Sequence, residues 1–104
     1  MIKLQIDGFD WDAGNRKKCR KHGVSEQEIG EVFHRDVAIF PDPVHSTDEQ
    51  RFHAVGRNDQ GRYVFLVFTL RQDGQSTLIR PISARYMHRK EIQRYEKDIS
   101  HAAQ

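Results

Sequence analysis

The chain has 104 residues, which suffices for one hydrophobic core and is too short for two, so a single domain over residues 1–104 is expected. Its 17 Lys and Arg residues barely exceed its 15 Asp and Glu residues, and this net charge of +2 argues against a strong polyanion binder. No apolar run approaches the roughly 20 residues that cross a bilayer, which excludes a transmembrane helix.

The N-terminal part predicts a strand followed by a basic helix. Residues 1–6 alternate apolar and polar side chains, which is the period of a strand with one covered face. A helix rich in Lys and Arg is expected over residues 13–22, because Gly23 suits the left-handed position that ends a helix. The strand and the helix are expected to pack on the same core.

The next segment carries the clearest local signal in the chain. Ser25 and Glu28 have the spacing of a capping box, in which each side chain binds the backbone N–H of the other residue. A second helix is therefore expected over residues 26–34. The two helices form a hairpin that turns at residues 22–25.

The rest of the chain predicts a sheet and a closing helix. Strands are expected at residues 37–40, 50–57, 62–70 and 76–84, and a helix at residues 87–99. The strand 62–70 is apolar throughout and is expected at the centre of the sheet, covered on both faces. Pro81 lacks a backbone N–H, so its strand lies at an edge or contains a bulge, while Pro41 is expected to end the first of these strands. This order predicts an α+β fold, with an N-terminal strand and helix hairpin packed on an antiparallel sheet.

Arginines run through the last strand and into the closing helix. They are Arg80, Arg85, Arg89 and Arg94, and a second basic segment covers residues 16–22. A guanidinium is costly to bury and presents a rigid fork of donors that suits phosphate. If the two basic segments meet in the fold, they form a local positive face despite the small net charge. The expected anion is the backbone of RNA or DNA.

Several other chemistries have no support in the sequence. The six histidines lie far apart without a zinc-binding spacing, and one cysteine, Cys19, cannot form an internal disulfide, so no metal site and no cofactor are expected. Ser83 lies in a predicted strand without the glycines of a nucleophile elbow. The first residues are too polar for a signal peptide, and together with the single cysteine they predict a cytoplasmic location.

A set of short motifs resembles the BrnT toxins. They are Phe9-x-Trp11-Asp12, Asn15, Arg20-Lys-His-Gly-Val-Ser25, Glu31-Val-Phe33, Asp42-Pro43 with His45-Ser46, Arg51-Phe52 before Gly56-Arg57, Ile82-Ser-Ala-Arg85 and Tyr95-Glu96. The resemblance implies a RelE-like fold and a ribonuclease activity that halts translation. It also implies a small BrnA-type antitoxin that assembles with the toxin, and we expect this assembly to be a heterotetramer. The complex is expected to bind promoter DNA only through the antitoxin.

Cleavage of RNA without a metal sets three chemical tasks. The ribose 2′-hydroxyl loses a proton, the departing 5′-oxygen gains one, and the added charge on phosphorus is stabilised. Arg57, Arg80 and Arg85 are assigned to the third task, because a guanidinium with a pKa above about 12 is a poor acid or base.

Proton transfer and substrate binding have several candidates. His22, Glu91 and Tyr95 are the candidates for proton transfer, and Glu91 suits the base if it stands near Arg85. The expected substrate-binding residues are Lys21, Tyr86, Arg89 and Tyr95, of which the tyrosines would stack on an unpaired base.

Each of these residues also has a purely structural interpretation. Lys21 and His22 suit the C-terminal carbonyls of the first helix, and Tyr95 lies on an apolar stripe. Arg80 and Arg85 suit ion pairs with Glu31, Glu91 or Glu96, and Glu91 suits a helix surface. The alternative functions are a catalytically silent module that holds the antitoxin and helps it repress DNA, or an unrelated small RNA-binding domain.

Overall fold

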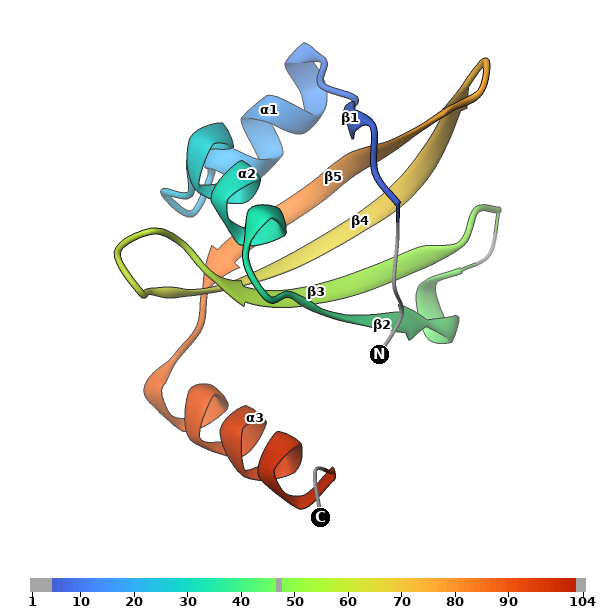
Figure 1. The fold of residues 1–104 in the computed structure, drawn as a ribbon. Helices are drawn as coiled ribbons and strands as arrows, with labels where there is room; N and C mark the ends of the chain where they lie inside the picture. The colour runs from blue at the N-terminus through green and yellow to red at the C-terminus, as the bar shows by residue number, and fades with distance from the viewer. Residues whose placement is uncertain (1–4, 47, 103–104) are drawn as a thin grey trace.

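The computed structural model describes residues 5–46 and 48–102, and these form an α+β fold with a five-stranded mixed sheet and three α-helices. The strands are β1 (Gly8–Phe9), β2 (Ala38–Asp42), β3 (Arg51–Arg57), β4 (Tyr63–Asp73) and β5 (Ser76–Tyr86), in the spatial order β1-β5-β4-β3-β2. The helices are α1 (Ala13–Arg20), α2 (Glu26–His34) and α3 (Arg89–Ala102), with a short 3₁₀ helix at Pro43–His45. α1 and α2 lie against one side of the sheet, whereas α3 follows β5 beyond its end (Figure 1).

The N-terminal strand differs from its prediction. Residues 1–4 lie outside the described part, residues 5–7 are not a strand, and the observed strand β1 is Gly8–Phe9. It pairs in parallel with Leu78 and Ile79 of β5 and so joins the edge of the sheet, whereas strands β2 to β5 pair antiparallel with one another, as predicted. Phe9 packs against the core, where its ring meets the ring of Phe33 edge-on at 5.8 Å.

The helix hairpin follows its local signals closely. α2 begins and ends where predicted, and Ser25 Oγ accepts a hydrogen bond from the backbone N–H of Glu28 at 3.1 Å, which confirms the capping box. α1 ends at Arg20, two residues earlier than predicted, and Gly23 has the expected left-handed conformation with φ of +88°. An unpredicted second capping box, formed by Asp12 and Asn15, begins α1.

Of the predictions made for the two prolines in the sheet, one is confirmed and the other is wrong. Opposite Pro81 the register between β4 and β5 shifts by one residue, which confirms a bulge at this position. The side-chain amide of Asn15 donates to the Pro81 carbonyl at 3.0 Å and so ties α1 to the bulge. Pro41 does not end β2, contrary to prediction, because β2 is the outermost strand and a missing N–H at the edge costs no ladder hydrogen bond.

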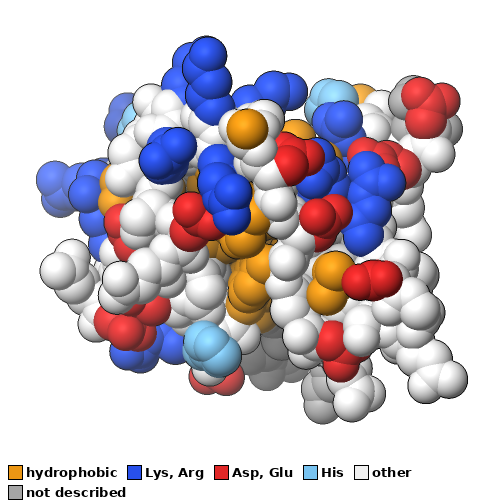
Figure 2. Space-filling model, turned by 90° about the horizontal axis from the view of Figure 1, so that it is seen from above, with side chains coloured by type: hydrophobic (Ala, Val, Ile, Leu, Met, Phe, Trp, Pro, Cys, Tyr) orange, Lys and Arg blue, Asp and Glu red, His pale blue; other side chains and the backbone are white. Residues whose placement is uncertain are grey.

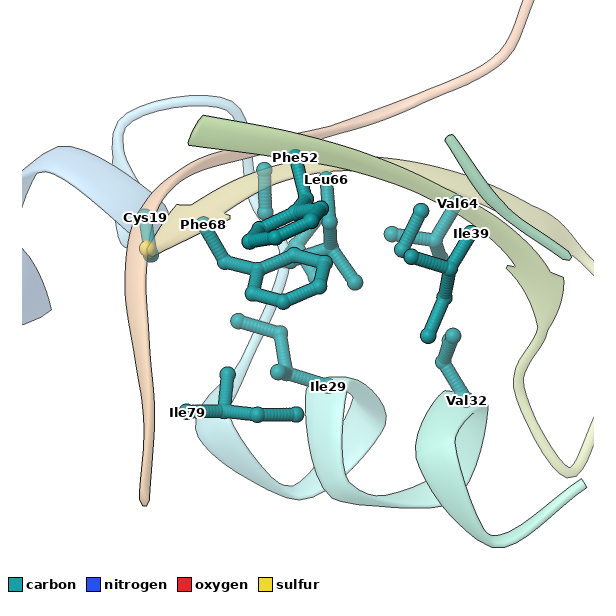
Figure 3. Close-up of a cluster of buried hydrophobic side chains, with 12 residues drawn as sticks. Cys19, Ile29, Val32, Ile39, Phe52, Val64, Leu66, Phe68 and Ile79 are labelled. Carbon is teal, nitrogen blue, oxygen red and sulfur yellow. The ribbon is translucent and has the colours of Figure 1, made fainter. Parts of the chain in front are cut away.

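The hydrophobic core lies between the sheet and the helix hairpin. Phe68 of β4 is fully buried, with its ring 5.4 Å from the rings of both Phe52 and Phe33, and Ile29 of α2 packs beneath it (Figure 3). β4 is the central strand, as predicted. Its second face is covered less completely than predicted, since Phe65 and Val67 on that face are only half-buried. We call this second face the open face of the sheet.

Three further elements extend beyond their predicted ends. β4 and β5 each continue for two or three residues past the expected ends and form a long hairpin. α3 begins two residues later than predicted and runs to Ala102. Among the described residues, no helix is long and apolar enough to span a membrane.

Candidate functional site

The C-terminal end of β5 brings together most of the residues selected from the sequence. Arg57 of β3 pairs in register with Tyr63 of β4, and Arg85 of β5 pairs with Phe65 of the same strand. Because Tyr63 and Phe65 are two residues apart, all four side chains belong to the open face. Two of the three predicted site arginines therefore lie on the same face at this end of the sheet, on the two strands that flank β4.

Arg57 is held by aromatic and acidic partners. Its Nη2 donates to the Tyr63 hydroxyl at 2.8 Å, and its guanidinium lies 4.6 Å from the centre of the Tyr63 ring. The Tyr63 hydroxyl in turn donates to Glu96 of α3 at 3.1 Å, and Tyr95 meets the Tyr63 ring edge-on at 5.8 Å. The hydrogen bond with Tyr63 is the main cause that raises the pKa of Arg57, so this guanidinium stays cationic.

Arg85 forms a two-pronged ion pair with Glu91. Its two terminal nitrogens donate to the two carboxylate oxygens at 2.7 and 2.8 Å, and its guanidinium lies 4.7 Å from the centre of the Phe65 ring. The expectation that Glu91 stands near Arg85 is confirmed. The hydrogen bonds from Arg85, with one from the backbone N–H of His88, lower the pKa of Glu91 to about 2. A carboxylate of such low pKa is a weak base at neutral pH.

The Arg85–Glu91 pair also makes the attachment of α3 dependent on pH. Because the folded-state pKa of about 2 lies below the ordinary value of 4.5, the pair stabilises the docked helix fully above about pH 4.5. This contribution is lost as the pH falls from about 4.5 towards 2. We expect the NMR signals of the Tyr63 and Tyr95 rings to shift over that range, and the Glu91→Gln variant to show the shifted signals already at pH 7. Signals of Tyr95 that stay constant in both cases would contradict this prediction.

Arg80 belongs to a different part of the molecule. It donates to Asp12, the N-cap of α1, at 2.7 Å, and to Asp10 at 3.5 Å. Its Cα lies roughly 15 Å along β5 from that of Arg85, given about 3.3 Å per residue in a strand. The predicted structural pairing of Arg80 is thus found, although with other acids than those expected, and Arg80 does not join Arg57 and Arg85.

Tyr86 faces the helix hairpin rather than the open face. Its hydroxyl donates to Glu28 at 2.6 Å and to the carbonyl of Gly23 at 3.3 Å, and the hydrogen bond with Glu28 is the main cause that raises the pKa of Tyr86. The guanidinium of Arg62 lies 3.4 Å from the centre of its ring. One ring face is therefore covered, and the ring ties β5 to the hairpin.

The three remaining predicted residues, Lys21, His22 and Arg89, are exposed. Lys21 and His22 lie in the turn between α1 and α2, and the bond from Tyr86 to Gly23 places this turn at the same end of the sheet as Arg85. Within residues 5–46 and 48–102, no side-chain hydrogen bond fixes His22. The two basic segments do meet in the fold, because α1 contacts β5. Figure 2 shows, however, that Lys and Arg side chains are interspersed with Asp and Glu side chains on the face it presents.

A groove of about 1000 Å³ separates α3 from the open face. Its floor is mostly apolar and comes from the sheet, with Phe40, Val55 and Phe65 among its residues. Its wall is the side of α3 that carries Glu91 and Tyr95. The groove thus begins at the Arg85–Glu91 pair and extends under the helix.

A cluster that the sequence did not reveal borders this groove through one of its three residues, His53. The buried carboxylate of Asp42 accepts hydrogen bonds from His45 Nδ1 and His53 Nε2, both at 2.9 Å, and His53 lines the groove. His53, Val55 and Arg57 follow one another at two-residue spacing along β3, so the sequence predicts that they share one face of the sheet. The contact of His53 with Asp42 could not be predicted, because the pairing of β2 with β3 determines it.

Among the residues that the structure describes, no group of three or more His, Cys, Asp or Glu side chains has an arrangement that could hold a metal ion. The acids nearest the two arginines are Glu91 and Glu96, and each of them is bound to Arg or Tyr donors. The site therefore offers cationic donors and aromatic surfaces rather than a set of metal ligands.

Comparison with known families gives one result. Residues 11–91 match a family described as the ribonuclease toxin BrnT of type II toxin–antitoxin systems. The matched segment contains the helix hairpin, strands β2 to β5 and the first residues of α3, and therefore both site arginines. A comparison with curated proteins gives no match.

Proposed function

The chain belongs to the BrnT family of ribonuclease toxins of type II toxin–antitoxin systems, and on this premise we propose that it is an endoribonuclease that cleaves RNA without a metal ion and thereby inhibits translation. Membership of this family implies an RNA target and a protein antitoxin as partner. The proposal adds the site, the chemistry and the kind of antitoxin.

The observation that carries the proposal is the pair Arg57 and Arg85 on the open face. Each guanidinium lies over an aromatic ring and is fixed by an acid of α3, so both are oriented before a substrate arrives. A guanidinium has five N–H donors, and Glu91 uses two of those on Arg85. The remaining N–H donors can bind phosphate oxygens and stabilise the extra negative charge of the transition state.

The metal-free chemistry is supported by the kinds of donors that the site supplies. RNA carries its own nucleophile, the 2′-hydroxyl, so the protein needs to bind the phosphate, stabilise charge and move protons. Arg57 and Arg85 provide the first two. Lys21 and Arg89 are exposed at the same end of the sheet and are proposed to contact neighbouring phosphates. Tyr95, half-buried at the groove, is proposed to contact a base.

The partner is proposed to be a BrnA-type antitoxin that forms a heterotetramer with the toxin and supplies the DNA contacts. Three large hydrophobic side chains, Phe40, Val44 and Ile99, are exposed, and such surface is typical of proteins that bind another chain. Among the described residues β2 is an outermost strand of the sheet, and its outer edge offers further backbone groups for a partner. A RelE-like classification and a cytoplasmic location complete the proposal.

The decisive experiment is incubation of the purified chain with single-stranded RNA in excess EDTA. We expect cleavage at an undiminished rate, with products that end in a 2′,3′-cyclic phosphate and a 5′-hydroxyl, because the 2′-oxygen is the nucleophile. Loss of cleavage in EDTA with recovery on adding Mg²⁺ would contradict the metal-free chemistry. RNA that stays intact at high protein excess, with or without Mg²⁺, would favour the catalytically silent antitoxin-binding module.

A further inference from the structure

The Asp42–His53 pair deepens the proposed ribonuclease function, on which the following step rests. We propose that His53 is the base that takes the proton from the ribose 2′-hydroxyl, and that the buried carboxylate of Asp42 orients its ring. Of the three proton-transfer candidates predicted from the sequence, Glu91 is bound to Arg85 through both oxygens and His22 lies in an exposed turn. Burial raises the pKa of the third, Tyr95, which keeps its hydroxyl protonated. His53 combines a fixed ring with access to the groove.

Asp42 has the properties of an orienting carboxylate. It ends β2, its residue is 5% exposed, and a single oxygen, Oδ2, accepts from both His45 and His53. Burial alone would raise the pKa of Asp42, but the hydrogen bonds from the two imidazoles outweigh burial and lower it. A buried carboxylate without hydrogen-bond partners raises the free energy of the folded protein. Movement of either imidazole ring away from Asp42 is therefore unfavourable, and both rings are held in place.

This arrangement decides which nitrogen of His53 is basic. An ionised carboxylate only accepts hydrogen bonds, so the nitrogen that faces it, Nε2, carries the hydrogen. In the neutral ring Nδ1 then holds the lone pair. The side chain of His53 is 33% exposed and lines the groove, whereas His45, at 65%, is not among the groove residues.

His53 also lies at a suitable place relative to Arg85. Its ring centre is 5.0 Å from that of Phe65, and the Arg85 guanidinium lies 4.7 Å from the same ring. His53 pairs with Val67 and Arg85 pairs with Phe65 of β4, so the two side chains start two strands and two residues apart, roughly 12 Å. Two hydrogen bonds of about 2.8 Å, one to a 2′-hydroxyl and one to its phosphate, take up nearly half of this span. The ribose and the phosphate group fill the rest.

The environment of His53 contains other charged groups. Besides Asp42 and His45, the titratable side chains that face the groove come from α3, and they are Lys90, Glu91, Arg94, Tyr95 and Asp98. Glu91 is bound to Arg85, so the only carboxylate in hydrogen-bond contact with His53 in the described part is that of Asp42. This contact is the one that the test below removes.

The proton and bond changes balance as follows. The 2′-oxygen bonds to phosphorus while its proton passes to His53 Nδ1, and the bond from phosphorus to the 5′-oxygen breaks. The departing 5′-oxygen takes a proton from water, and the resulting hydroxide takes the proton back from the imidazolium of His53. The products are a 2′,3′-cyclic phosphate and a 5′-hydroxyl, with the protein unchanged.

The test compares His53→Gln with His45→Ala and Asp42→Asn in single-turnover cleavage of RNA between pH 5 and 8. A glutamine amide still donates to Asp42 but takes no proton. We expect His53→Gln to cleave about 10²-fold more slowly and to lose the rise in rate from acidic to neutral pH. We expect His45→Ala to stay within a few-fold of the wild type, and Asp42→Asn to lie between these two. Circular dichroism checks that each variant is folded.

A second measurement does not depend on activity. In ¹⁵N-resolved NMR spectra of the wild-type protein, neutral His53 is expected as the Nε2–H form, and Asp42→Asn is expected to lose this preference. Neutral His53 in the Nδ1–H form would overturn the proposal. So would His53→Gln with wild-type rates while Arg85→Ala is inactive, and that result would leave the ribonuclease function standing. A wild-type protein that cleaves no RNA would overturn both.

Discussion

Replacement of Arg85 by alanine is expected to slow RNA cleavage by about 10³-fold, the upper range for loss of one fixed donor to a transition-state anion. The expectation rests on the fixed position of this guanidinium, which the Phe65 ring and both oxygens of Glu91 hold at the mouth of the groove. The measurement is single-turnover cleavage at saturating protein. Binding of RNA, measured separately, is expected to weaken far less, because Arg57 and the exposed basic residues remain.

Three further variants separate the possible causes of this loss. Arg85→Lys keeps the charge without the fork of donors and is expected to recover only part of the rate. Glu91→Gln loosens α3 but leaves the guanidinium, so a loss as large as that of Arg85→Ala would mean that helix attachment, not charge stabilisation, was lost. Arg71→Ala is the matched control, because Arg71 is a β4 arginine whose ion pair with Glu49 lies outside the site.

Arg80→Ala tests the choice among the three arginines that the sequence selected. Its partners Asp10 and Asp12 lie at the start of α1, so we expect a modest loss of stability and little change in the rate of cleavage by folded protein. Partial exposure of these groups limits the stabilisation by the ion pairs. A loss of cleavage as large as that of Arg85→Ala would contradict this prediction. It would instead support the assignment from the sequence, in which Arg80 and Arg85 both stabilise the charge on phosphorus.

Features set by neighbouring residues were predictable from the sequence. The capping box of Ser25 and Glu28 and the left-handed Gly23 depend on contacts within a few positions, and both are found. The family match was predictable as well, because its motifs are short and their order is specific. The bulge at Pro81 follows from a missing backbone donor, which is a property of that residue alone.

Features set by pairing between distant segments were not predictable. Arg80 and Arg85 are five residues apart, so strict alternation along β5 would place their side chains on opposite faces of the sheet. Because of the bulge, Arg80 pairs with Thr69 and Arg85 pairs with Phe65 of β4. These two partners are four residues apart, so both arginines lie on the same face. The parallel pairing of β1 and the contact of His53 with Asp42 likewise depend on register. The sequence showed that the last strand carries arginines, but not their partners, which come from the segment between β1 and α1 and from α3.

The fully buried Phe68 is expected to be the residue whose truncation costs the most stability. Phe68→Ala should lower the free energy of unfolding by about 3–5 kcal/mol, because it removes a ring that contacts Phe33 and Phe52 and leaves a cavity between the sheet and α2 (Figure 3). Small domains are stable by only about 5–15 kcal/mol, so we expect part of the population to unfold near 37 °C. Urea unfolding followed by circular dichroism measures the change.

The consequences of Phe68→Ala for the site depend on where the residue sits. Phe68 pairs with Pro81 at the bulge, and the bulge determines which face of β5 presents Arg85. We therefore expect the folded fraction of Phe68→Ala to cleave RNA more slowly than wild type, in contrast to a core residue remote from β5. Val44→Ala is the control for stability, since Val44 is 79% exposed and its truncation should change the free energy by less than about 0.5 kcal/mol. Equal unfolding midpoints for the two variants would show that the core does not centre on Phe68.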